Sequence, residues 1–140
     1  MNNLSIFGPF FAMALLVAIV AGLTFRERVR QYKAMRLHPQ KAPTRTEFST
    51  VMQDTRCSDN FQNLFETPVM FYVVCTGLYA TQTVSIVAVA LAWFYVLTRY
   101  AHSWVHCGKN KVMWRFRCFA TSVFTLIALW LMWGLALLGK

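Results

Sequence analysis

The chain has 140 residues, enough for one domain; 57% of them are hydrophobic and the net charge is +9. Apolar residues outnumber the buried positions of a soluble domain of this size, which excludes a soluble helical bundle with polar outer faces. The 14 Lys and Arg fall mainly in two clusters, with no basic groove interleaved with aromatic residues, which excludes nucleic-acid binding.

The first apolar run covers residues 6–25 and contains no charge. Twenty residues in a helix span about 30 Å, the thickness of the hydrocarbon core of a bilayer. Because no Lys or Arg precedes Ile6, we expect this run to be retained rather than cleaved as a secretory signal. The sequence predicts a helix over about 6–35, followed by a basic loop over about 36–56 that contains Pro39 and Pro43.

The second long uncharged stretch, residues 67–98, is too long for one membrane span. Its only polar cluster, Thr81 to Ser85, predicts a tight turn between helices over about 57–80 and 84–106. A short connection at 108–111 precedes a fourth helix over about 113–138. The expected fold is therefore an all-α integral membrane protein, a four-transmembrane-helix bundle that forms one domain over 1–140.

Orientation follows from the distribution of the cations. Twelve of the 14 Lys and Arg lie on or beside the first and third connections, and the opposite side carries only Lys140. The positive-inside rule places both basic connections in the cytoplasm and both termini outside, in the plasma membrane if the cell is bacterial.

Polar residues inside the apolar helices form two stripes. Arg56, Asn63 and Glu66 recur at helical spacing on the second helix, with Asp59 between them. Arg99, His102 and His106 do the same on the third helix, near the same side of the membrane. Ionisable groups at membrane depth are costly unless they are paired or face a wet cavity, so both stripes are candidate sites.

Two interpretations of the stripes stay open. In the structural one, Glu66 neutralises Arg99, and Asn63 and His102 complete the hydrogen bonds. In the functional one, surplus cations form a pocket for a small anion or a lipid headgroup, since the cations outnumber Glu66 and Asp59. Those cations are Arg56, Arg99, Arg115 and Arg117, with Arg26 or Arg28 at the end of the first helix.

A histidine-ligated metal or haem is a lesser alternative. His102 and His106 lie four residues apart on one helix face, but no carboxylate or thiolate completes a ligand set. The other helices offer no facing histidine, so no metal site is expected.

These motifs resemble those of a known family, the membrane-associated proteins in eicosanoid and glutathione metabolism (MAPEG). The pattern Arg56-Cys57-x5-Asn63-x2-Glu66-x-Pro68 is similar to the family's Arg, Asn-x-x-Glu signature. Arg99-x2-His102, followed by Gly108 and Arg115, resembles the end of the family's third helix and the start of its fourth. The chain is identified as a divergent, bacterial-type member, and the resemblance covers almost its whole length.

The resemblance implies a homotrimer in the lipid bilayer, with glutathione bound between subunits near the cytoplasmic face. Matched by position, Asn63 and Glu66 would hold the peptide part of glutathione, Arg99 would support Glu66, and Arg115 would stabilise the thiolate as the catalytic residue. Arg26 or Arg28 would face the thiol. The implied ligand-binding set is completed by Arg56, His102 and His106.

Two positions depart from the family pattern. Asp59 stands where glutathione-using members usually carry a basic residue, and His106 stands where they usually carry a tyrosine. Three hypotheses remain: a glutathione-dependent transferase or peroxidase acting on hydrophobic electrophiles or lipid hydroperoxides, a non-enzymatic membrane protein that binds anionic lipid or a protein partner, and the metal or haem protein.

Overall fold

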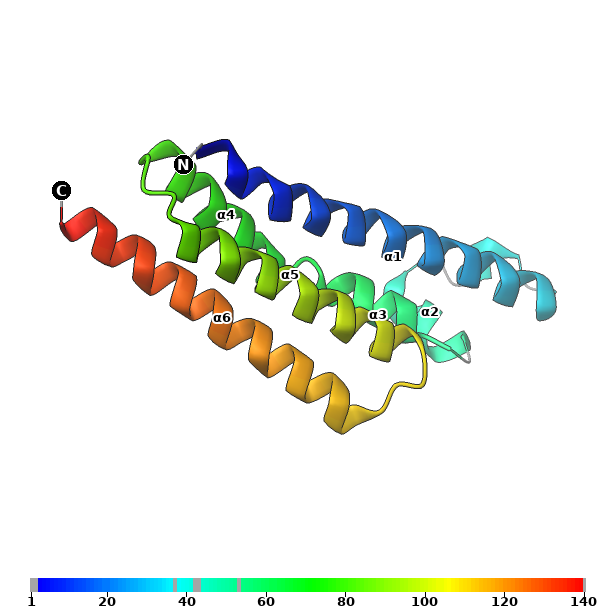
Figure 1. Cartoon of the computed structure of the whole chain (residues 1–140). Helices are drawn as coiled ribbons and strands as arrows, with labels where there is room; N and C mark the ends of the chain where they lie inside the picture. Colours follow the sequence, from blue (N-terminus) through cyan, green and yellow to red (C-terminus); the bar gives the residue numbers. More distant parts are fainter. Residues whose placement is uncertain (1–2, 37, 42–43, 53, 140) are drawn as a thin grey trace.

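The computed structural model describes residues 3–36, 38–41, 44–52 and 54–139, and every regular element in this part of the chain is helical. The elements in order are η1 (Asn3–Ile6), α1 (Phe7–Ala34), η2 (Pro39–Lys41), α2 (Arg45–Val51), α3 (Arg56–Asn63), α4 (Thr67–Ala80), α5 (Ile86–Cys107) and α6 (Val112–Leu138). The long helices run side by side (Figure 1). The all-α class is confirmed.

Both ends of the described chain lie at one end of the bundle, beside the α4–α5 turn (Figure 1). The segment with η2 and α2 lies at the other end, together with the α5–α6 turn (Figure 1). We call this second end the basic end, because twelve of the 14 cations lie on the segments that form it.

Three segments are long and apolar enough to cross a membrane: Asn3–Ala34, Ile86–Cys107 and Val112–Leu138. Their outer faces carry large exposed apolar side chains, among them Phe11 on α1, Leu97 on α5 and Leu131 on α6. Such surface is unusual in a soluble monomer and suits contact with lipid. Together these features make the chain an integral membrane protein.

The helix predicted over 57–80 is divided in the structure into α3 and α4, with a break at Leu64–Glu66. Pro68 explains the break, since it has no N–H to donate to the carbonyl of Leu64 and its ring would clash with that carbonyl in a continuous helix. Pro68 instead occupies the first turn of α4, where an N–H is not needed. Glu66 thus becomes the N-cap of α4, and its side chain is exposed.

The core lies where α4, α5 and α1 meet. Phe71 and Tyr95 stack with ring centroids 4.5 Å apart, and both are fully buried. The hydroxyl of Tyr100 donates to the carbonyl of Ala12 at 2.8 Å, which joins α5 to α1. At the turn end, Trp133 of α6 packs directly on Gly77 of α4, leaving no room for a side chain there.

The first predicted loop contains short helical segments as well. α2 begins with a capping box, in which the hydroxyl of Thr44 accepts from Glu47 N at 3.3 Å and Glu47 Oε2 accepts from Thr44 N at 3.0 Å. These contacts order part of the predicted loop, and Met52 after α2 is buried against Tyr32 and Met35 of the first helix and its end.

Candidate functional site

Arg99 is the most deeply buried charged residue among those the structure describes. It lies on α5 with no exposed surface, and its guanidinium carbon is 5.7 Å from the centre of the Phe119 ring. Nη2 donates to the backbone carbonyl of Asn63 at 3.3 Å, whereas Nε and Nη1 are buried without a hydrogen-bond partner. An unsatisfied buried cation of this kind costs free energy unless something offsets its charge.

The expected ion pair between Glu66 and Arg99 is not formed. Within the described residues, no carboxylate lies within 4 Å of the Arg99 guanidinium. The physical reason is the break before α4, which takes Glu66 off the face that α3 presents and leaves its side chain exposed. The structural interpretation of the two stripes therefore fails at its central contact.

Arg115, at the start of α6, is held by two side chains of the preceding turn and helix. Its Nη1 lies 3.1 Å from Nε2 of His106 and donates to Oδ1 of Asn110 at 2.8 Å. A guanidinium has no acceptor, so His106 must accept at Nε2 and carry its proton on Nδ1. That Nδ1–H is buried and has no partner.

His102 has the opposite arrangement. Its Nδ1 lies 3.1 Å from the backbone carbonyl of Arg115, which can only accept, so Nδ1 carries the proton. Its Nε2 is buried without a partner. The two rings meet edge to face with centroids 5.4 Å apart. His106 thus has an unused N–H donor at Nδ1, and His102 has an unused acceptor at Nε2. We call Arg99, His102, His106 and Arg115 the α5–α6 group.

Two buried polar residues beside this group, Asn60 and Ser103, were not among the predicted site residues. Asn60 of α3 is fully buried; its Oδ1 accepts from the hydroxyl of Ser103 at 3.4 Å, and its Nδ2 donates to Sγ of Cys107 at 3.5 Å. The available signal was spacing, since Asn60 lies four residues after Arg56 and three before Asn63 on the same helical face. Asn60 fixes α3 against α5 next to the α5–α6 group.

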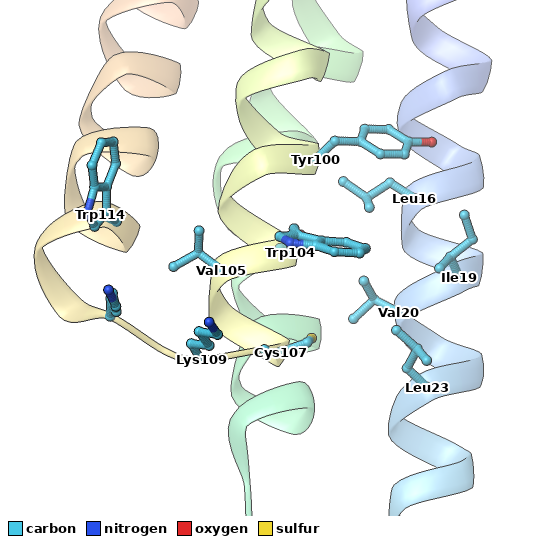
Figure 2. A pocket seen from close by; sticks show the side chains of 13 residues that line it. Leu16, Ile19, Val20, Leu23, Tyr100, Trp104, Val105, Cys107, Lys109 and Trp114 are labelled. Atoms are coloured by element: carbon cyan, nitrogen blue, oxygen red, sulfur yellow. The ribbon is translucent and has the colours of Figure 1, made fainter.

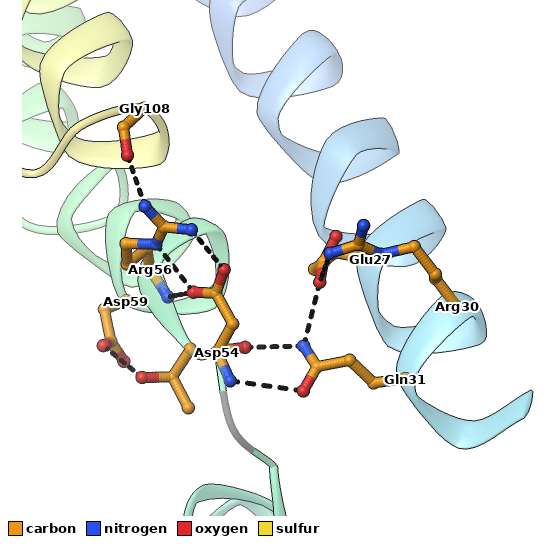
Figure 3. Close-up of polar contacts among 8 residues, drawn as sticks. Glu27, Arg30, Gln31, Asp54, Arg56, Asp59 and Gly108 are labelled. Atoms are coloured by element: carbon orange, nitrogen blue, oxygen red, sulfur yellow. Dashed lines mark hydrogen bonds and ion pairs between the residues drawn. The ribbon is translucent and has the colours of Figure 1, made fainter. Parts of the chain in front are cut away.

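Arg56 is engaged in contacts that join three parts of the chain (Figure 3). Its Nη2 lies 2.6 Å from Asp54 Oδ2, and its Nη1 donates to the carbonyl of Gly108 in the α5–α6 turn. The Arg56 guanidinium lowers the pKa of Asp54, and Asp54 raises the pKa of Arg56. The backbone of Asp54 also exchanges two hydrogen bonds with the side chain of Gln31, at 2.8 and 3.2 Å.

Arg26 and Arg28 lie on α1. Arg26 is exposed, and Arg28 is partly buried and donates to the hydroxyl of Ser58 on α3 at 3.2 Å. α1 packs on α3, α4 and α5, whereas α6 packs on α5 and α4, and α1 and α6 lie on opposite sides of the bundle (Figure 1). Arg26 and Arg28, which we call the α1 group, are therefore separated from Arg115 within one chain.

Each histidine already uses one ring nitrogen in a hydrogen bond with Arg115, which leaves one nitrogen per ring for a metal. Within the residues that the structure describes, no three His, Cys, Asp or Glu side chains come together in a way that could hold a metal ion. The arrangement is instead suited to an anion, since the α5–α6 group has two guanidinium groups and a spare N–H donor, and among the described residues no carboxylate lies within 4 Å of Arg99 or Arg115.

Comparison with known proteins gives one match. The model of the MAPEG family matches residues 6–135, which is nearly the whole chain. No curated protein and no solved structure gives a match.

Proposed function

Because the chain belongs to the MAPEG family, we propose that it is a glutathione-dependent transferase or peroxidase of the membrane that acts on hydrophobic electrophiles or lipid hydroperoxides. The family is associated with glutathione in general, and the α5–α6 group supports an anionic ligand in this chain. The proposal assigns Arg115 the catalytic role and gives the neighbouring residues the task of binding.

The observation that carries the proposal is the position of Arg115. Arg115 is partly exposed at the basic end and its guanidinium is oriented by His106 and Asn110, and no carboxylate of the described residues lies within 4 Å of it. A fixed cation beside a thiol favours the thiolate and lowers the thiol pKa from its usual value of about 8.5. The thiolate is the nucleophile, so such a position increases the supply of nucleophile at neutral pH.

The chemistry then depends on the second substrate. In conjugation, the sulfur forms a bond to an electrophilic carbon, the leaving group departs with its electron pair, and the thiol proton has already passed to solvent. In peroxide reduction, the sulfur attacks one peroxide oxygen, the O–O bond breaks to release an alcohol, and a second thiol reduces the oxidised sulfur to give a disulfide and water. Both reactions require the same activated thiol.

The ligand-binding residues are proposed to meet between subunits of a homotrimer. Arg26 and Arg28 on α1 lie on the opposite side of the bundle from Arg115 (Figure 1), so one chain does not bring them together. A neighbouring subunit that placed its α1 beside α6 would complete the set. Asn63 and Glu66 are proposed to bind the peptide part of glutathione, with Arg56, Arg99, His102 and His106 around it.

The topology proposed with this function has four spans: α1, α5 and α6, and one between α1 and α5 in chain order that α3 and α4 form in succession. The two basic connections face the cytoplasm and both termini face outside, in the plasma membrane if the cell is bacterial. The concentration of cations at the basic end supports this orientation.

The test compares Arg115→Gln with Arg117→Gln in purified full-length protein. Arg117 is exposed and its guanidinium carbon lies 5.5 Å from the centre of the Trp114 ring, so it offers the same charge change nearby without contacting the α5–α6 group. Thiolate absorbance in the ultraviolet is followed on addition of glutathione, together with conjugation of an aromatic electrophile. We expect both signals in wild type and Arg117→Gln, and loss of at least ten-fold in Arg115→Gln.

Absence of both signals in the wild-type protein would contradict an enzyme. The chain would then be a non-enzymatic MAPEG-fold membrane protein that binds anionic lipid or a protein partner through its basic end. An equal loss in the two variants would show that general positive charge, rather than the position of Arg115, produces the signal.

A further inference from the structure

A large apolar groove lies between α1 and α5 and ends at the α5–α6 turn (Figure 2). It has a volume of about 760 Å³, within the range of small-molecule binding sites. Leu16, Ile19 and Leu23 line it from α1, and Trp104 projects into it from α5 with 84% of its surface exposed (Figure 2). The stretch from Leu16 to Leu23 extends for about 10 Å along the helix axis.

The charged residues that line the groove lie at its end near the turn. Lys109 and Lys111 line that end, both are exposed, and within the described part of the chain neither forms an ion pair with a carboxylate. An apolar channel with two free cations at one end matches a molecule that has a hydrocarbon chain and an anionic head. Trp104 and Trp114 lie beside the cations, as tryptophans do at the level of lipid headgroups.

We propose that this groove binds one acyl chain of an anionic glycerophospholipid, with its phosphate between Lys109 and Lys111. The occupant follows from charge complementarity, since a zwitterionic lipid carries a cation that the two lysines would repel. The site is separate from the proposed glutathione site, because its lining residues lie on α1, on α5, in the turn and at the start of α6, and none of them belongs to the α5–α6 group.

The experiment uses full-length protein in phosphatidylcholine vesicles that contain a small, equal fraction of either brominated phosphatidylglycerol or brominated phosphatidylcholine. Bromine quenches tryptophan fluorescence at short range, so the difference in quenching between the two lipids reports preferential occupancy near a tryptophan. We expect stronger quenching by phosphatidylglycerol in the wild type. Trp104→Phe should lose most of this difference.

The variant Lys109→Gln/Lys111→Gln tests the headgroup contacts. A lysine near an anionic lipid contributes about 1 kcal/mol, so loss of two should weaken the relative affinity for phosphatidylglycerol about 30-fold. The matched control is Lys33→Gln/Arg36→Gln, which removes two exposed charges at the same end of the bundle but outside the groove. The control should keep the preference.

Equal quenching by the two lipids in the wild type would overturn the proposal, and would be the result if a second copy of the chain covered the groove. An equal loss of preference in the two double variants would also overturn it, because the attraction would then come from the whole basic end. Glutathione-dependent thiolate absorbance should be unchanged in Lys109→Gln/Lys111→Gln, so failure of the lipid proposal is distinguishable from failure of the proposed enzyme.

Discussion

Replacing Arg99 by Met is expected to separate ligand binding from stability. Arg99 has no exposed surface, and its Nε and Nη1 have no hydrogen-bond partner among the described residues. Each unsatisfied buried group lowers the stability of the fold by about 1–3 kcal/mol. The one hydrogen bond that Arg99 makes, from Nη2 to the carbonyl of Asn63 at 3.3 Å, offsets no more than one of these two losses. Replacing unsatisfied buried charge with an apolar side chain of similar volume is often neutral or stabilising by about 1–4 kcal/mol.

We therefore expect Arg99→Met to leave the thermal unfolding midpoint of the ligand-free protein in detergent unchanged or raised, while glutathione-dependent thiolate absorbance is lost. The matched control is Arg56→Met, since Arg56 is paired with Asp54 and donates to Gly108. That variant leaves Asp54 without its partner and should lower the midpoint. If Arg99→Met lowered the midpoint as much as Arg56→Met, the charge of Arg99 would be satisfied in the ligand-free protein and our reasoning would be refuted.

Three further predictions concern stability and hydrogen bonding. Gly77→Ala should lower the midpoint, because its Cβ would lie 2.3 Å from the ring of Trp133 and overpacking costs about 1–3 kcal/mol; Gly22→Ala, with nothing within 4 Å, should not. The pKa of Asp54 is lower in the folded than in the unfolded protein, so its contribution to stability is complete above about pH 4 and is lost as the pH falls through the folded-state pKa. The difference in unfolding midpoint between wild type and Asp54→Asn should therefore shrink from pH 6 to pH 3. His106→Phe removes the acceptor that orients Arg115, and should raise the KM for glutathione more than Asn110→Ala, which leaves the histidine in place.

The long helices could be predicted from the sequence because uncharged runs of sufficient length have one stable arrangement in a bilayer. The runs predicted helices over 6–35, 84–106 and 113–138, and the structure has α1, α5 and α6 within one or two residues of these bounds. The break before α4 was missed because the helical spacing of Arg56, Asn63 and Glu66 continues across it. Its signal is local and lies in Pro68, whose ring is incompatible with a helix that continues from residue 64.

Helical spacing allowed prediction of which residues of the candidate site share a helix face, but not of their contacts with other helices. Spacing placed Arg99, His102 and His106 on one face of α5, and the structure brings them together with Arg115. The partners of each ring nitrogen depend on how the α5–α6 turn folds back, with Asn110 at φ 47°, and no periodicity determines that. Buried Asn60 was missed for a related reason, since its contacts with Ser103 and Cys107 exist only after α3 packs on α5.

Glu66 has an exposed carboxylate and Arg99 has a guanidinium with unsatisfied N–H groups, so both side chains could take a partner from outside their own chain. Within the described residues the two charges form no ion pair with each other or with another side chain, because the break before α4 separates them. Burying Arg99 in hydrocarbon costs free energy that the hydrogen bond to Asn63 and the contact with Phe119 offset only in part, since Nε and Nη1 have no partner among the described residues. A subunit interface that supplies an anionic ligand to Arg99 and a cation of the neighbour to Glu66 would offset both charges. Assembly and ligand binding would then be coupled, since each would reduce the cost of the other.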